Sequence, residues 1–252
     1  MKNRPGTFLC DELALSGVRY STVLLDLDHT LFDSDFSESA AFGEAMRVAG
    51  VDDPAPYAES YRRINVDLWS AVERGEISPQ RVRDHRFERL VEEEKLDADP
   101  RRMASVFVAG LAKNGDLYSG AREVIEELSD KVSLALVTNG LSEVQRARIE
   151  RLGIGSYFDA IVISAEVGTS KPGTKIFDIA FDALLRPPKE SAVMVGDSLS
   201  SDIRGGSNYG IATCWYNPKG RKSGPDDRVS HQIGNLSELF LFVNRDIAAR
   251  RS

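Results

Sequence analysis

The sequence predicts an α/β protein with a doubly wound parallel sheet and an inserted all-α domain. Five short apolar runs, rich in branched side chains, are typical of strands and occupy residues 22–27, 132–137, 160–163, 192–195 and 211–215. Helical patterns separate the later runs. The first two runs, however, lie roughly 100 residues apart with no strand pattern between them, which is too long for one crossover connection.

The later runs predict an open, Rossmann-like core. Strands that alternate with helices form parallel sheets, and near-continuous apolar strands are buried on both faces. One helix begins at Ser142, and Gln145 follows three positions later, which predicts a capping box. Because such cores bind ligands at the carboxyl ends of their strands, functional side chains should follow the apolar runs.

The long interval after the first run predicts a bundle of four or five helices. Its apolar residues recur at helical spacing, and prolines mark helix starts. The expected division is an N-terminal extension at 1–20, a core at 21–34 and 115–252, and a helical cap at 35–114. Four arginines at 81–89 are interpreted as a solvated basic face paired with nearby glutamates, and Trp69 and Phe87 as bundle core.

Composition excludes several classes of function. The chain has 252 residues, of which 42% are hydrophobic, so it can bury a sizeable core. Its formal net charge of −7 has the wrong sign for a protein that follows a nucleic-acid polymer. We see no membrane-spanning run or signal peptide and expect a cytoplasmic monomer or homodimer without a membrane partner. Cys10 and Cys214 predict neither a disulfide nor a zinc site.

Asp26 and Asp28 end the first predicted strand two positions apart, so their side chains should point the same way. Two such carboxylates repel each other, and a cation or a proton relieves the repulsion. An isolated pair of this kind is also common as a solvated strand end. The pair therefore needs support from other strand ends.

Three further features supply that support. Thr138 and Asn139 follow the second run, Lys171 follows the loop after the third, and Asp197 follows the fourth. Each alone has a structural explanation as a turn, a surface loop or a helix cap. Because the carboxyl ends of parallel strands lie at one edge of the sheet, we expect these side chains to surround one crevice, with Asp202 nearby.

The combination predicts phosphoryl transfer. A carboxylate that attacks a phosphate monoester needs Mg²⁺ to offset the charge, with Asp26, the carbonyl of Asp28 and Asp197 as hard oxygen ligands. Thr138, the Asn139 amide and Lys171 would donate to the remaining phosphate oxygens. Gly196 permits close backbone approach.

These residues resemble the four motifs of the haloacid dehalogenase superfamily, in order. Residues 26–30 resemble its first motif, Thr138-Asn139 its second, Lys171-Pro172 its third, and residues 196–198 with Asp202 its fourth. The resemblance spans about residues 22–235. It implies a C1-type cap, a metal site of Asp26, Asp28 and Asp197, and supporting roles for Thr30, Ser198 and Asp202.

The resemblance also assigns roles to the two aspartates. Asp26 would attack phosphorus to form an aspartyl phosphate, and Asp28 would protonate the leaving oxygen and then activate water. Because an ordinary aspartic acid has a pKa of ~3.9, we expect the closed site to favour the protonated form of Asp28. The dehalogenases of the superfamily lack this second aspartate, so Asp28 favours phosphatase activity.

A narrower resemblance is to the 5'-nucleotidases that act on pyrimidine and noncanonical nucleoside monophosphates. It is carried by residues 65–69, 75–77, 86–87, 138–146, 196–206 and 213–217. Phosphatases of sugar phosphates, including phosphorylated sialic acids, have similar fourth motifs and remain an alternative. A phosphomutase, a phosphorylated signalling receiver and a scaffold with a dead site are further alternatives. A receiver, however, would have no use for the helical insertion.

Overall fold

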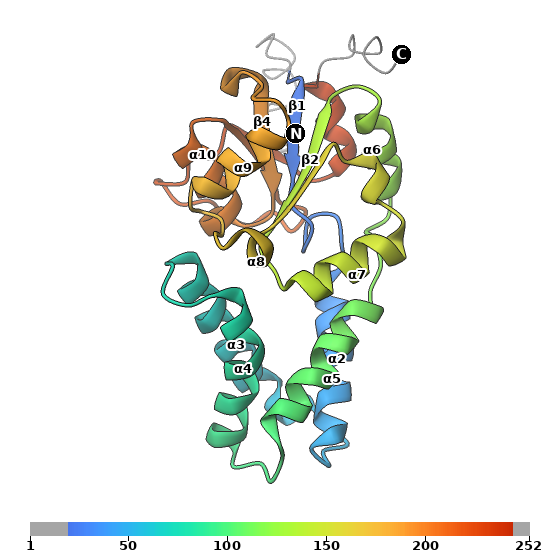
Figure 1. The fold of residues 1–252 in the computed structure, drawn as a ribbon, viewed down its shortest axis with the longest axis vertical. Coiled ribbons are helices and arrows are strands. Elements are labelled where there is room, and N and C mark those ends of the chain that lie inside the picture. Colours follow the sequence, from blue (N-terminus) through green and yellow to red (C-terminus); the bar gives the residue numbers. More distant parts are fainter. Residues whose placement is uncertain (1–19, 244–252) are drawn as a thin grey trace, which may run out of the picture.

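The computed structural model describes residues 20–243, so residues 1–19 of the expected N-terminal extension, Cys10 among them, lie outside the described residues. A six-stranded parallel sheet in the order β3-β2-β1-β4-β5-β6 forms the centre (Figure 1). Its strands are β1 (Thr22–Leu25), β2 (Ser133–Thr138), β3 (Ala160–Ile163), β4 (Ala192–Gly196), β5 (Ala212–Tyr216) and β6 (His231–Ile233). The predicted doubly wound α/β class is confirmed.

Helices cover both faces of the sheet, because alternate strand residues face opposite sides. The helices of the core are α6 (Ala121–Ser129), α7 (Ser142–Leu152), the short α8 (Ser164–Val167), α9 (Lys175–Ala183) and α10 (Arg204–Tyr209). Val23 and Leu25 of β1 join the apolar cluster that includes α6 and α7, whereas Leu24 joins the cluster that includes α9 and α10. Shorter turns are η1 (Ala55–Tyr57), η2 (Gly155–Tyr157), η3 (Lys189–Ser191), η4 (Leu199–Ile203) and η5 (Leu236–Leu241).

Four helices between β1 and α6 form a second body below the carboxyl edge of the sheet in Figure 1. We call these four helices the cap; they are α2 (Ser34–Val48), α3 (Ala58–Glu73), α4 (Pro79–Glu94) and α5 (Pro100–Lys113). The cap has an apolar core of its own, in which the rings of Phe42 and Tyr61 stack with centroids 4.3 Å apart. Phe87 is fully buried there, as expected.

The two chain segments that join the cap to the sheet run side by side. The backbone N–H of Asp33 donates to the carbonyl of Asp116 at 2.9 Å, and that of Tyr118 donates to the carbonyl of Leu31 at 2.8 Å. These bonds tie the exit from β1 to the entry into α6. The cap is therefore held at the edge of the sheet where the side chains that follow β1 lie.

The capping box expected at Ser142 is wrong. Leu141 precedes α7, and its side chain makes no capping hydrogen bond. Ser142 instead donates to Glu166 at 2.7 Å, and Gln145 turns toward the loop after β1, where its amide nitrogen lies 2.6 Å from Asp28. Both side chains bond residues that are distant in the sequence, and a local sequence pattern does not reveal such partners.

The arginines of α4 were expected to form a solvated basic face. This holds for Arg81 and Arg89 but not for Arg86. Arg81 is exposed, and Arg89 pairs with Asp67 at 3.3 Å and with Glu93 at 3.5 Å. Arg86 is only 3% exposed and lies over the ring of Phe107. The face of α4 that carries these arginines is therefore partly exposed to solvent and partly packed inside the cap.

No helix within residues 20–243 is long and apolar enough to cross a membrane. Strand β6 was missed by the sequence analysis because its three residues, His231-Gln232-Ile233, form no apolar run.

Candidate active site

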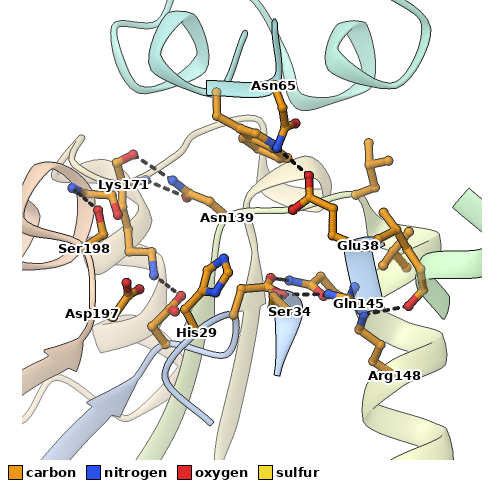
Figure 2. Close-up of a pocket in the computed structure, with 18 of the residues that line it drawn as sticks. His29, Ser34, Glu38, Asn65, Asn139, Gln145, Arg148, Lys171, Asp197 and Ser198 are labelled. Atoms are coloured by element: carbon orange, nitrogen blue, oxygen red, sulfur yellow. Dashed lines mark hydrogen bonds and ion pairs between the residues drawn. The ribbon is translucent and has the colours of Figure 1, made fainter. Parts of the chain in front are cut away.

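A cavity of about 250 Å³ lies between the carboxyl ends of the strands and the cap. Figure 2 shows Lys171, Asp197 and Ser198 on one side of it, and Ser34, Gln145 and Arg148 on the other. The predicted site residues that line this cavity are Asp26, Asp28, Asn139, Lys171, Asp197, Ser198 and Asp202. Side chains that are up to 176 positions apart in the sequence are thus brought to one place, as counted from Asp26 to Asp202.

Strand register explains this convergence. Leu25 of β1 pairs with Leu136 of β2 and with Val195 of β4, so the three strands end almost level. The backbone N–H of Asp26 extends the pairing by donating to the carbonyl of Val195 at 3.0 Å. Residues that follow these strands must therefore lie at the same edge of the sheet.

Lys171 is a buried cation shared between two carboxylates. Its Nζ lies 2.6 Å from Asp26 Oδ1 and 2.7 Å from Asp202 Oδ1, and it donates to the carbonyl of Val137 at 2.6 Å. Burial acts to lower the pKa of Lys171, but the carboxylates of Asp202 and Asp26 outweigh it and raise the pKa above its ordinary value. Lys171 is therefore positively charged at neutral pH.

Asp26, Asp197 and Asp202 form an acidic cluster in which one oxygen of each lies within 4.8 Å of the others. Burial raises the pKa of Asp197 to about 6, and the charge of Asp202 adds to this effect. Burial also raises the pKa of Asp26, while Lys171 opposes the rise. Three hard oxygen donors at this separation fit a divalent cation such as Mg²⁺. The cluster contains two of the expected ligands, Asp26 and Asp197, together with Asp202. The third expected ligand is the backbone carbonyl of Asp28.

Thr30 and Gly196 position this cluster. The Thr30 hydroxyl donates to Asp26 Oδ2 at 3.3 Å and accepts from the backbone N–H of Asp197 at 3.1 Å. A Cβ on Gly196 would lie 2.2 Å from Asp202 Oδ2, so any other residue at this position would have to displace this carboxylate. The Ser198 backbone N–H donates to the same oxygen at 3.0 Å.

The Asp28 carboxylate is held by three donors. Ser34 donates to it at 2.5 Å, Gln145 at 2.6 Å and Arg148 at 2.7 Å. Burial acts to raise the pKa of Asp28, but Arg148, Ser34 and Gln145 outweigh it and hold the pKa below its ordinary value. The expectation that the site favours protonated Asp28 is therefore wrong for this conformation.

Sequence reasoning missed Gln145 and Arg148 as functional candidates. They lie three positions apart on α7, so they share one helix face, and both are buried. Arg148 also donates to the carbonyl of Leu111 at 2.9 Å and to Ser37 at 3.0 Å, both in the cap. The sequence did contain one sign of their role, because these two polar residues occupy positions on the apolar face of the helix.

Thr138 and Asn139 do not present their side chains as expected. Thr138 is fully buried behind Gln145, whose amide nitrogen lies 2.8 Å from the Thr138 hydroxyl oxygen. The Asn139 side chain bonds both the backbone N–H and the carbonyl of Lys171, each at 2.9 Å. These two side chains position neighbouring residues, so any contact of Asn139 with phosphate would come from its backbone N–H.

Comparison with known proteins agrees with this geometry. The family model described as haloacid dehalogenase-like hydrolase matches residues 23–216. Pyrimidine 5'-nucleotidase PynA of Streptococcus pneumoniae is 31% identical, over 90% of this chain and 97% of its own. The N-acylneuraminate-9-phosphatase of Mus musculus is 33% identical, over 90% of this chain and 94% of its own.

A solved structure shows the same fold. The HAD-hydrolase YfnB of Bacillus subtilis, in a magnesium-bound crystal form, aligns with a TM-score of 0.81 and 31% identity, covering 88% of this chain and 97% of that one. Since the family model spans most of the sequence and relatives align over nearly their full length at more than 30% identity, the chain belongs to the haloacid dehalogenase-like hydrolases.

Proposed function

We propose that this chain is a Mg²⁺-dependent phosphomonoesterase that acts on a nucleoside 5'-monophosphate through an aspartyl phosphate on Asp26. The observation that carries the proposal is the meeting of Asp26, Lys171, Asp197 and Asp202 at one end of a single cavity. A bound Mg²⁺ would supply positive charge between these carboxylates and the phosphate oxygens. Lys171 would supply a second, fixed positive charge there.

Asp26 would act as the nucleophile, and its surroundings support this role. It follows β1 directly, is 6% exposed, and has Oδ1 bound to Lys171 and Oδ2 bound to Thr30. In the proposed first step an Asp26 oxygen forms the bond to phosphorus while the bond from phosphorus to the leaving oxygen breaks. Water then attacks the same phosphorus while the bond from phosphorus to the Asp26 oxygen breaks, which releases phosphate and restores the Asp26 carboxylate.

Asp28 would serve as acid and then as base. In the first step it gives a proton to the leaving oxygen, and in the second it accepts a proton from the attacking water. Arg148 and Gln145 hold it as an acceptor in this conformation, which is the state that the second step needs. Protonation for the first step would require these contacts to loosen.

The names of the relatives support the substrate class. Two relatives of similar identity are a pyrimidine 5'-nucleotidase and an N-acylneuraminate-9-phosphatase, both phosphomonoesterases. A nucleoside monophosphate is preferred here because the cavity is lined by Trp69 and by apolar side chains such as Leu141 and Val144, which suit a flat base. Sugar phosphates are the second candidate.

Phosphate release from uridine 5'-monophosphate (UMP) tests the proposal. Activity should require Mg²⁺ and should stop with a chelator. Asp26→Asn should lower kcat by at least about 10³-fold, because the amide is a poor nucleophile. Asp97→Asn, at an exposed position in the cap, is the matched control and should keep full activity. Robust turnover by Asp26→Asn would refute the nucleophile assignment, and an isomerised product without free phosphate would indicate a phosphomutase.

A further inference from the structure

The cap contributes a cluster of polar side chains to the far wall of the cavity. Glu38 of α2, Asn65 of α3 and Arg86 of α4 line it, together with the half-buried ring of Trp69. Figure 2 shows Asn65 and Glu38 facing each other on the cap side, away from Asp197. Neither the acidic cluster nor Lys171 uses these groups, so they are available to whatever is joined to the phosphate.

Arg86 is a buried cation that forms no direct ion pair within the described chain, and its guanidinium lies beside the ring of Tyr61, whose hydroxyl donates to Glu38. It is 3% exposed, its guanidinium carbon lies 4.6 Å from the Phe107 ring centre, and its Nε has no hydrogen-bond partner. Among residues 20–243 it forms no ion pair with a carboxylate. Arg148, the other buried arginine of the cavity, bonds Asp28, Ser37 and a backbone carbonyl. Because a buried N–H group without an acceptor is costly, the unpartnered Nε of Arg86 points to an acceptor on the bound ligand.

Glu38 and Asn65 offer the complementary chemistry. Tyr61 donates to Glu38 Oε1 at 2.5 Å and Asn65 donates to the same oxygen at 2.7 Å, so both bonds fall on one of the two carboxylate oxygens. The side-chain oxygen of Asn65 is buried and has no hydrogen-bond partner. A ligand that fills this wall would therefore donate hydrogen bonds to Glu38 or Asn65 and accept them from Arg86.

Among the described residues, the cap side of the cavity carries no excess of positive charge. Arg86 is the only cation that the described part of the cap places against the cavity, and Glu38 is beside the same cluster. Glu73 lines the cavity as well. A leaving group that brought a second negative charge would therefore meet carboxyl groups without a spare cation, and burial would make that repulsion expensive.

We propose that Arg86, Glu38 and Asn65 select a neutral, planar leaving group that carries a carbonyl oxygen beside an N–H, and that they disfavour leaving groups with a second anionic group. The uracil ring has this chemistry, with Trp69 as a flat neighbour. A sugar acid or a bisphosphate does not fit. This inference rests on the proposed function, because it assumes that a phosphate monoester occupies the site.

The first part of the test compares substrates of the wild-type enzyme with Mg²⁺. UMP should exceed ribose 5-phosphate in kcat/KM by at least about tenfold, because only UMP carries the base. The 5-carboxamide derivative of UMP should exceed the 5-carboxy derivative by about tenfold, because the two differ in charge and hardly in size. Equal kcat/KM values within either pair would overturn the part of the inference that the pair tests.

The second part of the test uses variants. For each variant the measured quantity is the ratio of kcat/KM for UMP to kcat/KM for ribose 5-phosphate, because a general loss of activity lowers both values and cancels in the ratio. Arg86→Met should lower this ratio about tenfold, mainly through the KM for UMP, and Arg86→Lys should lower it less. Arg81→Met, at an exposed position of the same helix, is the matched control and should leave the ratio unchanged. An unchanged ratio in Arg86→Met would overturn the role of Arg86.

Glu38→Gln keeps the test decisive if Arg86→Met fails to fold. This variant should narrow the difference between the carboxamide and carboxylate derivatives several-fold, since it removes one negative charge at constant size. An unchanged difference would overturn charge selection by the cap. Absence of phosphate release from every substrate, p-nitrophenyl phosphate included, would instead overturn the proposed function and with it the premise of this inference.

Discussion

Gly196 is the residue on which the acidic cluster depends most directly. Its position leaves no room for a Cβ, which would lie 2.2 Å from Asp202 Oδ2. We therefore predict that Gly196→Ala displaces Asp202, lowers phosphate release at least about tenfold and destabilises the fold by about 1–3 kcal/mol. Activity assays and thermal denaturation would measure the two effects. Gly224→Ala, where the nearest contact is an ordinary 3.4 Å, should change neither, and a fully active Gly196→Ala would contradict this account.

The site residues divide into those that the sequence could predict and those that it could not. Asp26, Lys171 and Asp197 follow strands or their loops, so a parallel sheet brings them together whatever the details of packing. Gln145 and Arg148 act from a helix, and their roles depend on which face of α7 meets the loop after β1. That orientation is set by tertiary packing, which periodicity alone does not determine.

At the scale of elements, a surface ion pair joins the cap to the sheet domain. Arg83 of α4 lies 3.3 Å from Glu143 of α7, and Gln80 donates to the carbonyl of Ala165 in α8 at 3.2 Å. The pair is partly exposed, and pairs of this kind contribute about 0.2–1 kcal/mol. The pair therefore contributes little to folding, and we expect its main effect to be on the position of the cap over the cavity.

Charge reversal of this pair tests that role. Arg83→Glu places two negative charges together, so we predict a KM for UMP raised about two- to fivefold with little change in kcat. The double variant Arg83→Glu with Glu143→Arg should restore the wild-type KM. Steady-state kinetics at low ionic strength is the measurement. A KM that does not respond, or a double variant that is no better than the single one, would show that the pair does not position the cap.

The same contrast between local pattern and packing holds for the elements themselves. The five apolar strands and the helical insertion follow from periodicity, and the structure contains them. Strand β6 is too short to leave a pattern and forms because β5 offers it a free edge. Arg86 was assigned to solvent from its helical spacing, whereas the aromatic cap core takes it in.

At the scale of the whole molecule, the acidic cluster links stability to pH and metal. The pKa of Asp197 is raised from 3.8 to about 6, so the native state holds this proton more tightly than the unfolded chain does. The resulting stabilisation is complete below pH 3.8 and is lost as the pH rises through about 6. Above that range the cluster is more strongly anionic, and a cation can replace the proton.

Mg²⁺ should therefore raise the melting temperature more at pH 8 than at pH 5.5, since protons compete with the metal at the lower pH. Differential scanning fluorimetry with and without Mg²⁺ would show the difference. Asp197→Asn should reduce the Mg²⁺-induced rise at both pH values. An equal rise at the two pH values in the wild type would place the metal elsewhere.

Chemical trapping of the covalent intermediate is the most direct measurement of the central claim, that Asp26 attacks phosphorus. Enzyme quenched during turnover of UMP with Mg²⁺ would be treated with borohydride, which reduces an aspartyl phosphate to homoserine, and mapped by peptide mass spectrometry. The account predicts homoserine at position 26, absent without substrate. Rapid turnover that leaves Asp26 unmodified, or that modifies another carboxylate in its place, would contradict it.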